Sequence, residues 1–280
     1  MISDSNAASS NTSQPAAETA RSVQPRRFTD KVAVITGVSD RGIGGAIAER
    51  LAREGASVAM LCRHEPHKLL KLLDRLECDA RSINCDITQS SQITAAVEWT
   101  VDQLGGLEIL VHNAGVESAG RLVEVPIEKW KALLDVNLQG AIQMSQSVLP
   151  VMKSGGVIVN VASTLSIGGC AGYSVYSASN AGLIGFTQSL AWELAPRGIR
   201  VVADSPGLIH TPMVFKHIAR WTPEARDKVE ACHPLGIGTP HDVANAVAFL
   251  ASSEGHWITG VNLPLGWAPH YPLPFQHFLG

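Results

Sequence analysis

A glycine-rich segment near the amino terminus is the first part of the sequence whose residue types indicate chemistry. It reads TGVSDRGIG from Thr36 to Gly44 and directly follows an apolar, β-branched run. Gly37 leaves that run, and Gly42 and Gly44 lie where a helical pattern begins, so the backbone could approach a pyrophosphate at the positive end of a helix. The spacing is not G-x-G-x-x-G, but its place in a βαβ unit favours a dinucleotide site over a simple tight turn.

Alternating strand and helix patterns must position this loop. Apolar runs indicate strands at residues 31–36, 57–62, 81–85, 107–111, 156–162 and 200–203, and helical spacing indicates helices at 43–54, 66–77, 90–104 and about 174–194. We therefore expect one α/β domain, a doubly wound Rossmann-type fold with a parallel sheet of about seven strands and helices on both faces. Ligands of such folds bind at the carboxyl ends of the strands.

The composition of the chain limits the size of its core and the kinds of partner to expect. The chain has 280 residues, of which 45% are hydrophobic and 17% charged, with a net charge of −3. This length can fill a large single core, and the small charge gives no reason to expect nucleic acid or an anionic membrane as partner. No apolar run approaches the roughly 20 residues that span a bilayer. Five cysteines without a CxxC pair indicate reduced thiols in a cytoplasmic protein.

Two unlike tails flank the expected domain, which spans residues 28–266. Residues 1–27 are rich in Ser, Ala, Asn and Thr, so we expect a flexible tail. This stretch lacks the apolar region of a secretory signal, and its acidic residues count against an organelle transit peptide. Residues 267–280 hold aromatic side chains among three prolines and are expected to dock on the body or on a neighbouring subunit.

The motifs together resemble the short-chain dehydrogenase/reductase family over about residues 30–265. The family usually shows T-G-x-x-x-G-x-G in the glycine loop, where this chain has one extra residue. The other matching segments, in the family's order, are CDIT at 85–88, HNAG at 112–115, DVNLQG at 135–140, Ser163 ending a strand, Tyr176 after the family's typical spacing, and PGLIHT at 206–211.

The resemblance implies a set of residues that hold a nicotinamide dinucleotide. They are Gly37, Arg41, Gly42, Ile43, Gly44, Arg63, Asp86, Ile87, Asn113, Ala114, Gly115, Asn180, Pro206, Gly207, Ile209 and Thr211. Where NAD enzymes usually carry an acidic residue after the second strand, this chain has Cys62 followed by Arg63. Arg63 and Arg41 align with basic residues of NADP-preferring relatives, and a guanidinium suits a 2′-phosphate, so we expect NADP(H).

The same resemblance implies that Tyr176 donates a proton, Ser163 bonds the substrate oxygen and Asn137 supports a water chain. The family motif Y-x-x-x-K ends here in Asn180, which can bond a ribose hydroxyl but carries no charge. An unassisted tyrosine has a pKa of about 10 and is only about 0.1% phenolate at pH 7. We therefore expect slow activity near neutral pH and oxidation that strengthens in alkali, unless His112 or His210 supplies a cation.

The expected function is that of an NADP(H)-dependent oxidoreductase that reduces a carbonyl or oxidises a secondary alcohol, with attenuated activity. The alternative is a catalytically silent scaffold or sensor that binds NADP(H); a halide-expelling lyase of the same fold would lack the cofactor loop. Apolar and aromatic residues in the substrate loop, residues 208–238, favour a substrate with a hydrophobic part, unless they only pack the loop onto the body. The resemblance implies a homotetramer or homodimer, and no residue spacing indicates a metal site.

Overall fold

The computed structural model of the chain describes residues 26–218 and 222–266, the side chains of 216–218 excepted. Its centre is a parallel sheet with strand order β3-β2-β1-β4-β5-β6-β7. The strands are β1 (Val32–Thr36), β2 (Ser57–Cys62), β3 (Ala80–Asn84), β4 (Ile109–His112), β5 (Val157–Val161), β6 (Arg200–Pro206) and β7 (Asn262–Leu265). The predicted fold class is confirmed. The strand order reverses at β1, which lies between β2 and β4, and this switch point opens a crevice for a ligand.

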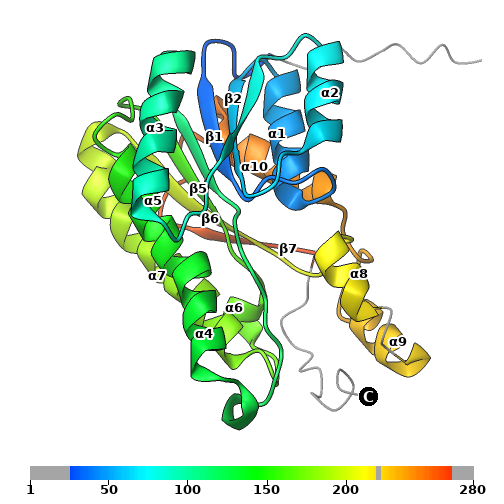
Figure 1. Cartoon of the computed structure of the whole chain (residues 1–280). Coiled ribbons are helices and arrows are strands. Elements are labelled where there is room, and N and C mark those ends of the chain that lie inside the picture. The colour runs from blue at the N-terminus through cyan, green and yellow to red at the C-terminus, as the bar shows by residue number, and fades with distance from the viewer. Residues whose placement is uncertain (1–25, 219–221, 267–280) are drawn as a thin grey trace, which may run out of the picture.

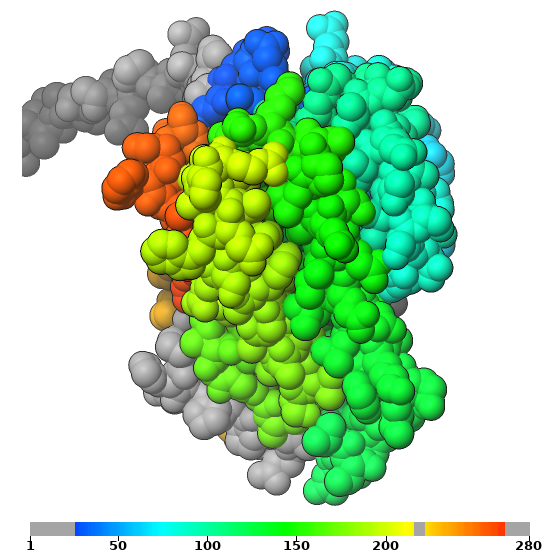
Figure 2. Space-filling model, turned by 90° about the vertical axis from the view of Figure 1, so that its left-hand side faces the viewer, coloured from blue at the N-terminus to red at the C-terminus, as the bar shows by residue number. Residues whose placement is uncertain are grey.

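Helices cover both faces of the sheet (Figure 1). One face carries α1 (Ile43–Arg53), α2 (His67–Arg75) and α10 (Pro240–Ala251), and the other carries α3 (Ser90–Leu104), α5 (Gly140–Val148) and α7 (Ser174–Leu194). The last three lie side by side in Figure 2. Beyond the carboxyl ends of the strands lie α4 (Ile127–Leu134), α6 (Leu165–Gly168), α8 (Pro212–Ile218) and α9 (Pro223–Ala231).

The core consists of two apolar layers, one on each face of the sheet. Neighbouring residues of β1 divide between them: Ile35 packs in the cluster that contains Ile47 of α1, and Val34 packs in the cluster that contains Ile93 of α3 and Met144 of α5. All five side chains are fully buried. Burial of both faces explains why β1, β2 and β4 have continuous apolar runs rather than an alternating pattern.

The amino-terminal edge of the body lies slightly before the expected residue 28. Phe28 is buried, and its N–H donates to the carbonyl of Glu54 at 3.0 Å. Arg27, expected in the tail, forms ion pairs with Glu54 and Glu254, so it belongs to the body. Residues 1–25 and 267–280 lie outside the described residues. Within the described part of the chain, no helix is long and apolar enough to cross a membrane.

Candidate active site

The glycine loop is fastened to the segment that follows β4. Gly37 has φ +69°, and a Cβ there would lie 2.4 Å from the Cα of Ala114, so only glycine permits this approach. The Asn113 amide donates to the carbonyls of Thr36 and Gly37 at 3.0 Å, and a Cβ at Gly44 would lie 2.4 Å from that amide nitrogen. The Thr36 hydroxyl accepts from the N–H groups of Asn113 and Ala114 at 3.1 Å. These contacts leave a cradle of backbone at the start of α1.

Asp40 in the glycine loop contacts the start of α2. A carboxylate oxygen of Asp40 accepts from the N–H groups of Lys68 and Leu69, both at 3.0 Å, at the first turn of α2. Pro66 is the N-cap of this helix and makes no side-chain cap, so Asp40 satisfies these orphan donors from another element. Asp40 therefore ties the glycine loop to α2. Arg41, the next residue, is exposed.

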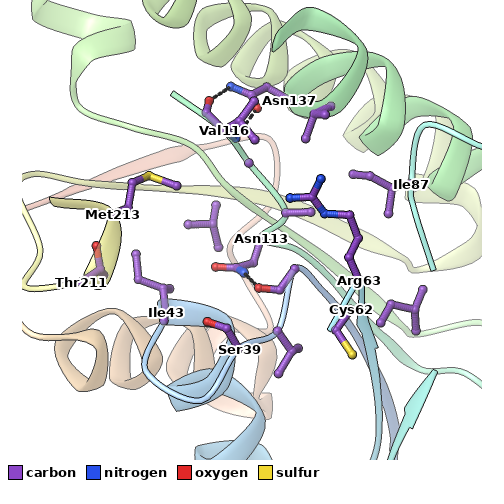
Figure 3. Close-up of a pocket in the computed structure, with 18 of the residues that line it drawn as sticks. Ser39, Ile43, Cys62, Arg63, Ile87, Asn113, Val116, Asn137, Thr211 and Met213 are labelled. Carbon is purple, nitrogen blue, oxygen red and sulfur yellow. Dashed lines mark hydrogen bonds between the residues drawn. The ribbon is translucent and has the colours of Figure 1, made fainter. Parts of the chain in front are cut away.

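A cavity of about 430 Å³ lies beside this loop at the carboxyl ends of the strands (Figure 3). Of the expected cofactor residues, its wall contains Gly37, Gly42, Ile43, Arg63, Asp86, Ile87, Asn113, Ala114, Gly115, Asn180 and Thr211. Arg63 reaches between Asn113 and Ile87, on the opposite side from Thr211 and Met213 (Figure 3). The pKa of Asp86 is lowered because its carboxylate accepts from the N–H and hydroxyl of Thr88.

Several expected cofactor residues are not on the cavity wall. Arg41 is exposed outside it, so the structure does not place this arginine with Arg63. Gly44 packs against Asn113 instead. The others not on the wall are Pro206, Gly207 and Ile209. The carbonyl of Pro206 accepts from the N–H of Thr164 at 3.0 Å, which joins their loop to the segment of Ser163.

Tyr176 and Asn180 lie on the cavity wall, one helical turn apart on α7. Burial raises the pKa of Tyr176, hydrogen bonding to Ser163 lowers it, the Glu117 carboxylate raises it, and hydrogen bonding to Asn180 lowers it, with a net rise. The Asn180 amide nitrogen also donates to the Tyr176 carbonyl at 2.9 Å. Ser163 is buried but does not itself line the cavity. The phenol of Tyr176 is therefore held in its protonated form at neutral pH.

Asn137 joins the segment after β4 to α7 through its side-chain hydrogen bonds. It lies in a π-helical turn, Asp135–Gln139, of the kind that often marks functional positions. Its side-chain oxygen accepts from the Val116 N–H at 2.8 Å, and its nitrogen donates to the Val116 carbonyl at 2.9 Å and to the Ser179 hydroxyl at 3.2 Å (Figure 3). These bonds fix the backbone that follows β4 against α7.

Neither His112 nor His210 lies on the cavity wall. His112 is fully buried and bonds Ser145 at 2.8 Å, and burial lowers its pKa to about 3, so it is neutral at pH 7. The hypothesis that His112 supplies a cation is therefore wrong. His210 is exposed, stacks on Phe215 with centroids 5.6 Å apart and is not on the cavity wall. No group of three or more metal-ligating side chains occurs among residues 26–218 and 222–266.

The substrate loop is anchored by a neutral histidine. His233 Nε2 accepts from the Leu208 N–H at 2.9 Å, so Nδ1 carries the proton and donates to the Val229 carbonyl at 2.7 Å. Burial lowers the pKa of His233, in agreement with this neutral tautomer. Of the apolar residues expected to meet substrate, Met213 lines the cavity. The side chains of His217 and Ile218, and Trp221, lie outside what is described.

Glu117, which the sequence reasoning did not single out, acts electrostatically on the two tyrosines at the start of α7, although it does not line the cavity. Its carboxylate raises the pKa of both Tyr173 and Tyr176, and one of its oxygens is buried. Its position in the sequence could have identified it, because Glu117 lies only two residues after HNAG. The residue between them, Val116, lines the cavity.

Comparison with known proteins supports the resemblance to the short-chain dehydrogenase/reductase family. A family model described as Enoyl-(Acyl carrier protein) reductase matches residues 37–265. The protein named 3-oxoacyl-acyl-carrier-protein reductase FabG of Thermotoga maritima is 39% identical over 240 residues, which are 84% of this chain and 95% of the relative. The protein of the same name from Vibrio cholerae is 39% identical over 236 residues, 83% of this chain and 94% of the relative.

Solved structures agree in fold. A blue fluorescent protein from a metagenomic library, in complex with NADPH, is 33% identical with a TM-score of 0.80, covering 88% of this chain and all of the other. A short-chain dehydrogenase from Burkholderia cenocepacia, in complex with NADP, is 35% identical with a TM-score of 0.80 and the same coverage. With the site geometry and these matches together, the chain belongs to the short-chain dehydrogenase/reductase family of oxidoreductases.

Proposed function

We propose that this protein reduces a carbonyl group to a secondary alcohol with NADPH. The observation that carries the proposal is the placement of Tyr176, coupled to Ser163, on the wall of the cavity that the glycine cradle and Arg63 also form. A crevice at the switch point of a doubly wound sheet is where such folds bind dinucleotides. The cradle suits the pyrophosphate, because it presents backbone rather than side chains at a helix N-terminus.

The chemistry divides between cofactor and protein. NADPH, when bound, supplies the hydride that the carbonyl carbon accepts. Tyr176 donates a proton to the oxygen, and Ser163 orients the tyrosine hydroxyl and the substrate. The raised pKa of Tyr176 keeps the proton in place before the reaction, which favours reduction over oxidation at neutral pH. Met213 and Thr211 on the wall offer a partly apolar surface to the rest of the substrate.

Loss of Tyr176 tests this function directly. The measurement is NADPH oxidation with a panel of ketones and one 3-oxoacyl thioester, chosen because of the names of the related reductases. We expect measurable reduction by the wild-type protein and about a 100-fold lower rate in Tyr176→Phe, because one general acid contributes roughly 10²–10⁴-fold. Tight NADPH binding without turnover of any substrate would instead favour the silent scaffold, which the neutral Asn180 makes the second candidate.

Arg63 is expected to select the phosphorylated cofactor. It is the one Lys or Arg among the described residues on the cavity wall, and two solved relatives were crystallised with NADP or NADPH. Arg63→Ala should lower the ratio of NADPH to NADH affinity by about tenfold or more, because it removes a charge-assisted contact to the 2′-phosphate. Fluorescence titration with both cofactors measures this ratio.

Arg75→Ala is the matched control for that measurement. It removes an equal charge from an exposed position on α2 off the cavity wall, so the affinity ratio should change less than twofold. An equal loss in both variants would show that general charge, rather than a specific contact of Arg63, sets the preference.

A further inference from the structure

The turn between β2 and α2, residues 63–66, borders one end of the cavity and carries two basic side chains. Arg63 and His64 both lie on the cavity wall, and Arg63 reaches between Asn113 and Ile87 (Figure 3). Both residues are exposed, so a ligand in the cavity can reach them. The ring of His64 forms no hydrogen bond or ion pair with any residue that the structure describes, and its nitrogens are open to such a ligand.

Two neighbouring elements hold this turn. The side-chain amide of Asn84, the last residue of β3, donates to the carbonyl of Arg63 at 3.0 Å. Asp40 of the glycine loop accepts from the first turn of α2, a helix that begins three residues after His64. The turn therefore has a defined position relative to the glycine cradle, and its two basic side chains start from fixed backbone rather than from a free loop.

The carboxylates around this turn each have another partner. They are Glu65, which contacts Nδ1 of His67 at 3.1 Å, Asp86, which accepts from Thr88, and Asp40, which accepts from Lys68 and Leu69. The other charged or titratable groups at this end of the surrounding elements are Arg41, Lys68, Cys62 and Cys85. Burial raises the pKa of both thiols, so they are neutral at pH 7. A proton on the His64 ring would therefore be stabilised mainly by an anion that enters the cavity.

A phosphate monoester is an anion that suits this pair of side chains. It carries about 1.5 to 2 negative charges at pH 7 and three acceptor oxygens, and arginine and protonated histidine both form charge-assisted hydrogen bonds to such oxygens. A histidine changes its charge between about pH 5 and 8, and an opposite charge nearby favours the protonated form. A phosphate beside Arg63 would thus draw a proton onto His64.

We propose that His64 is a second ligand of the 2′-phosphate, beside Arg63, and that it binds this group in its protonated form. The proposal rests on the proposed function, since it requires NADPH in this cavity. NADH lacks the 2′-phosphate, so its affinity does not depend on His64. The preference for NADPH over NADH consequently increases as pH falls from 8.5 to 6.5, a range in which the phosphate, whose second pKa is about 6, stays mostly ionised.

The pH dependence of cofactor affinity tests this role. Fluorescence titration of the wild-type protein should give a ratio of NADPH to NADH affinity about five- to tenfold higher at pH 6.5 than at pH 8.5, because a nearby opposite charge shifts a pKa by roughly 1–3 units. In His64→Gln the ratio should change less than about twofold over this range. His241→Gln is the matched control, because His241 is exposed on α10 off the cavity wall, and it should behave as the wild-type protein does.

Proton uptake gives a readout that a merely structural role of His64 would not change. Calorimetric titration at pH 7.5 in buffers of different ionisation enthalpy measures the protons bound with each cofactor. We expect the wild-type protein to take up about half a proton more per NADPH than His64→Gln does, which follows from a pKa near 6.5 in the free protein and about one unit higher beside the phosphate. Binding of NADH should show no such difference between the two proteins.

A permanent charge at the same position should remove the pH dependence without removing the preference. In His64→Arg the affinity ratio should be at least as high at pH 8.5 as the wild-type ratio is at pH 6.5. A wild-type ratio that is independent of pH, or equal proton uptake by the wild-type protein and His64→Gln, would overturn the role of His64 and leave NADPH selection by Arg63 standing. Failure of the wild-type protein to bind NADPH would overturn the proposed function as well.

Discussion

Asn180→Lys is expected to raise alcohol oxidation at pH 7 by about 10–1000-fold. In the wild-type protein burial and Glu117 raise the pKa of Tyr176, and the neutral Asn180 opposes this only through a hydrogen bond. An ammonium within about 4–6 Å lowers the pKa of an acid by roughly 1–3 units, and each unit gives tenfold more phenolate below that pKa. The measurement is the oxidation rate of a secondary alcohol as a function of pH.

The sign of the pH dependence is part of this prediction. Because the pKa of Tyr176 lies above its ordinary value, wild-type oxidation should still be rising about tenfold per pH unit at pH 9. In Asn180→Lys the rise should level off at a lower pH. Asn180→Met is the control for side-chain shape, because methionine is similar in length to lysine but uncharged. Equal gains from both substitutions would show that packing at position 180, and not charge, limits the rate.

The fold was predictable because each β-branched run had to be a buried strand and each amphipathic pattern a covering helix. The helices that the sequence reasoning did not place are α4, α5, α6, α8, α9 and α10. In α10, apolar residues occupy most positions. A helix that packs against α1 and the sheet has too wide an apolar stripe for a clean periodicity. The predicted dimer or tetramer stays a prediction, since the contacts described here are within one chain.

Motifs located the site better than they assigned its individual contacts. The glycine loop, residues 113–115 and Tyr176 meet at one cavity, because parallel strands end at the same edge of the sheet. The role of Arg41 stays a prediction. Its neighbour Asp40 turns toward α2, a tertiary contact with no local sequence signal. His112 was misjudged as a possible cation because its burial depends on α5, far along the chain, which supplies Ser145.

Asp204→Val is expected to stabilise the protein at pH 8 by about 2 kcal/mol, a rise in Tm of roughly 4–8 °C. Asp204 occupies a strand position opposite Val161 and is 0% exposed. Neither of its carboxylate oxygens has a hydrogen-bond partner within the described residues, and burial raises its pKa well above the ordinary value. An apolar side chain of similar volume removes this cost, because none of the residues that the structure describes forms a hydrogen bond with the carboxylate.

The stabilisation should depend on pH with a definite sign. A carboxyl whose folded pKa is raised binds its proton more tightly in the folded state, so the wild-type protein loses stability as pH rises above about 4 and through the raised value. The valine variant lacks this loss, so its advantage should be smaller at pH 5 than at pH 8 in thermal unfolding. Asp74→Ala, an exposed aspartate on α2, should show no comparable pH-dependent gain. An advantage for Asp204→Val that is the same at both pH values would mean that the folded and unfolded states bind this proton equally, so that the pKa of Asp204 is not raised by folding and packing alone explains the gain.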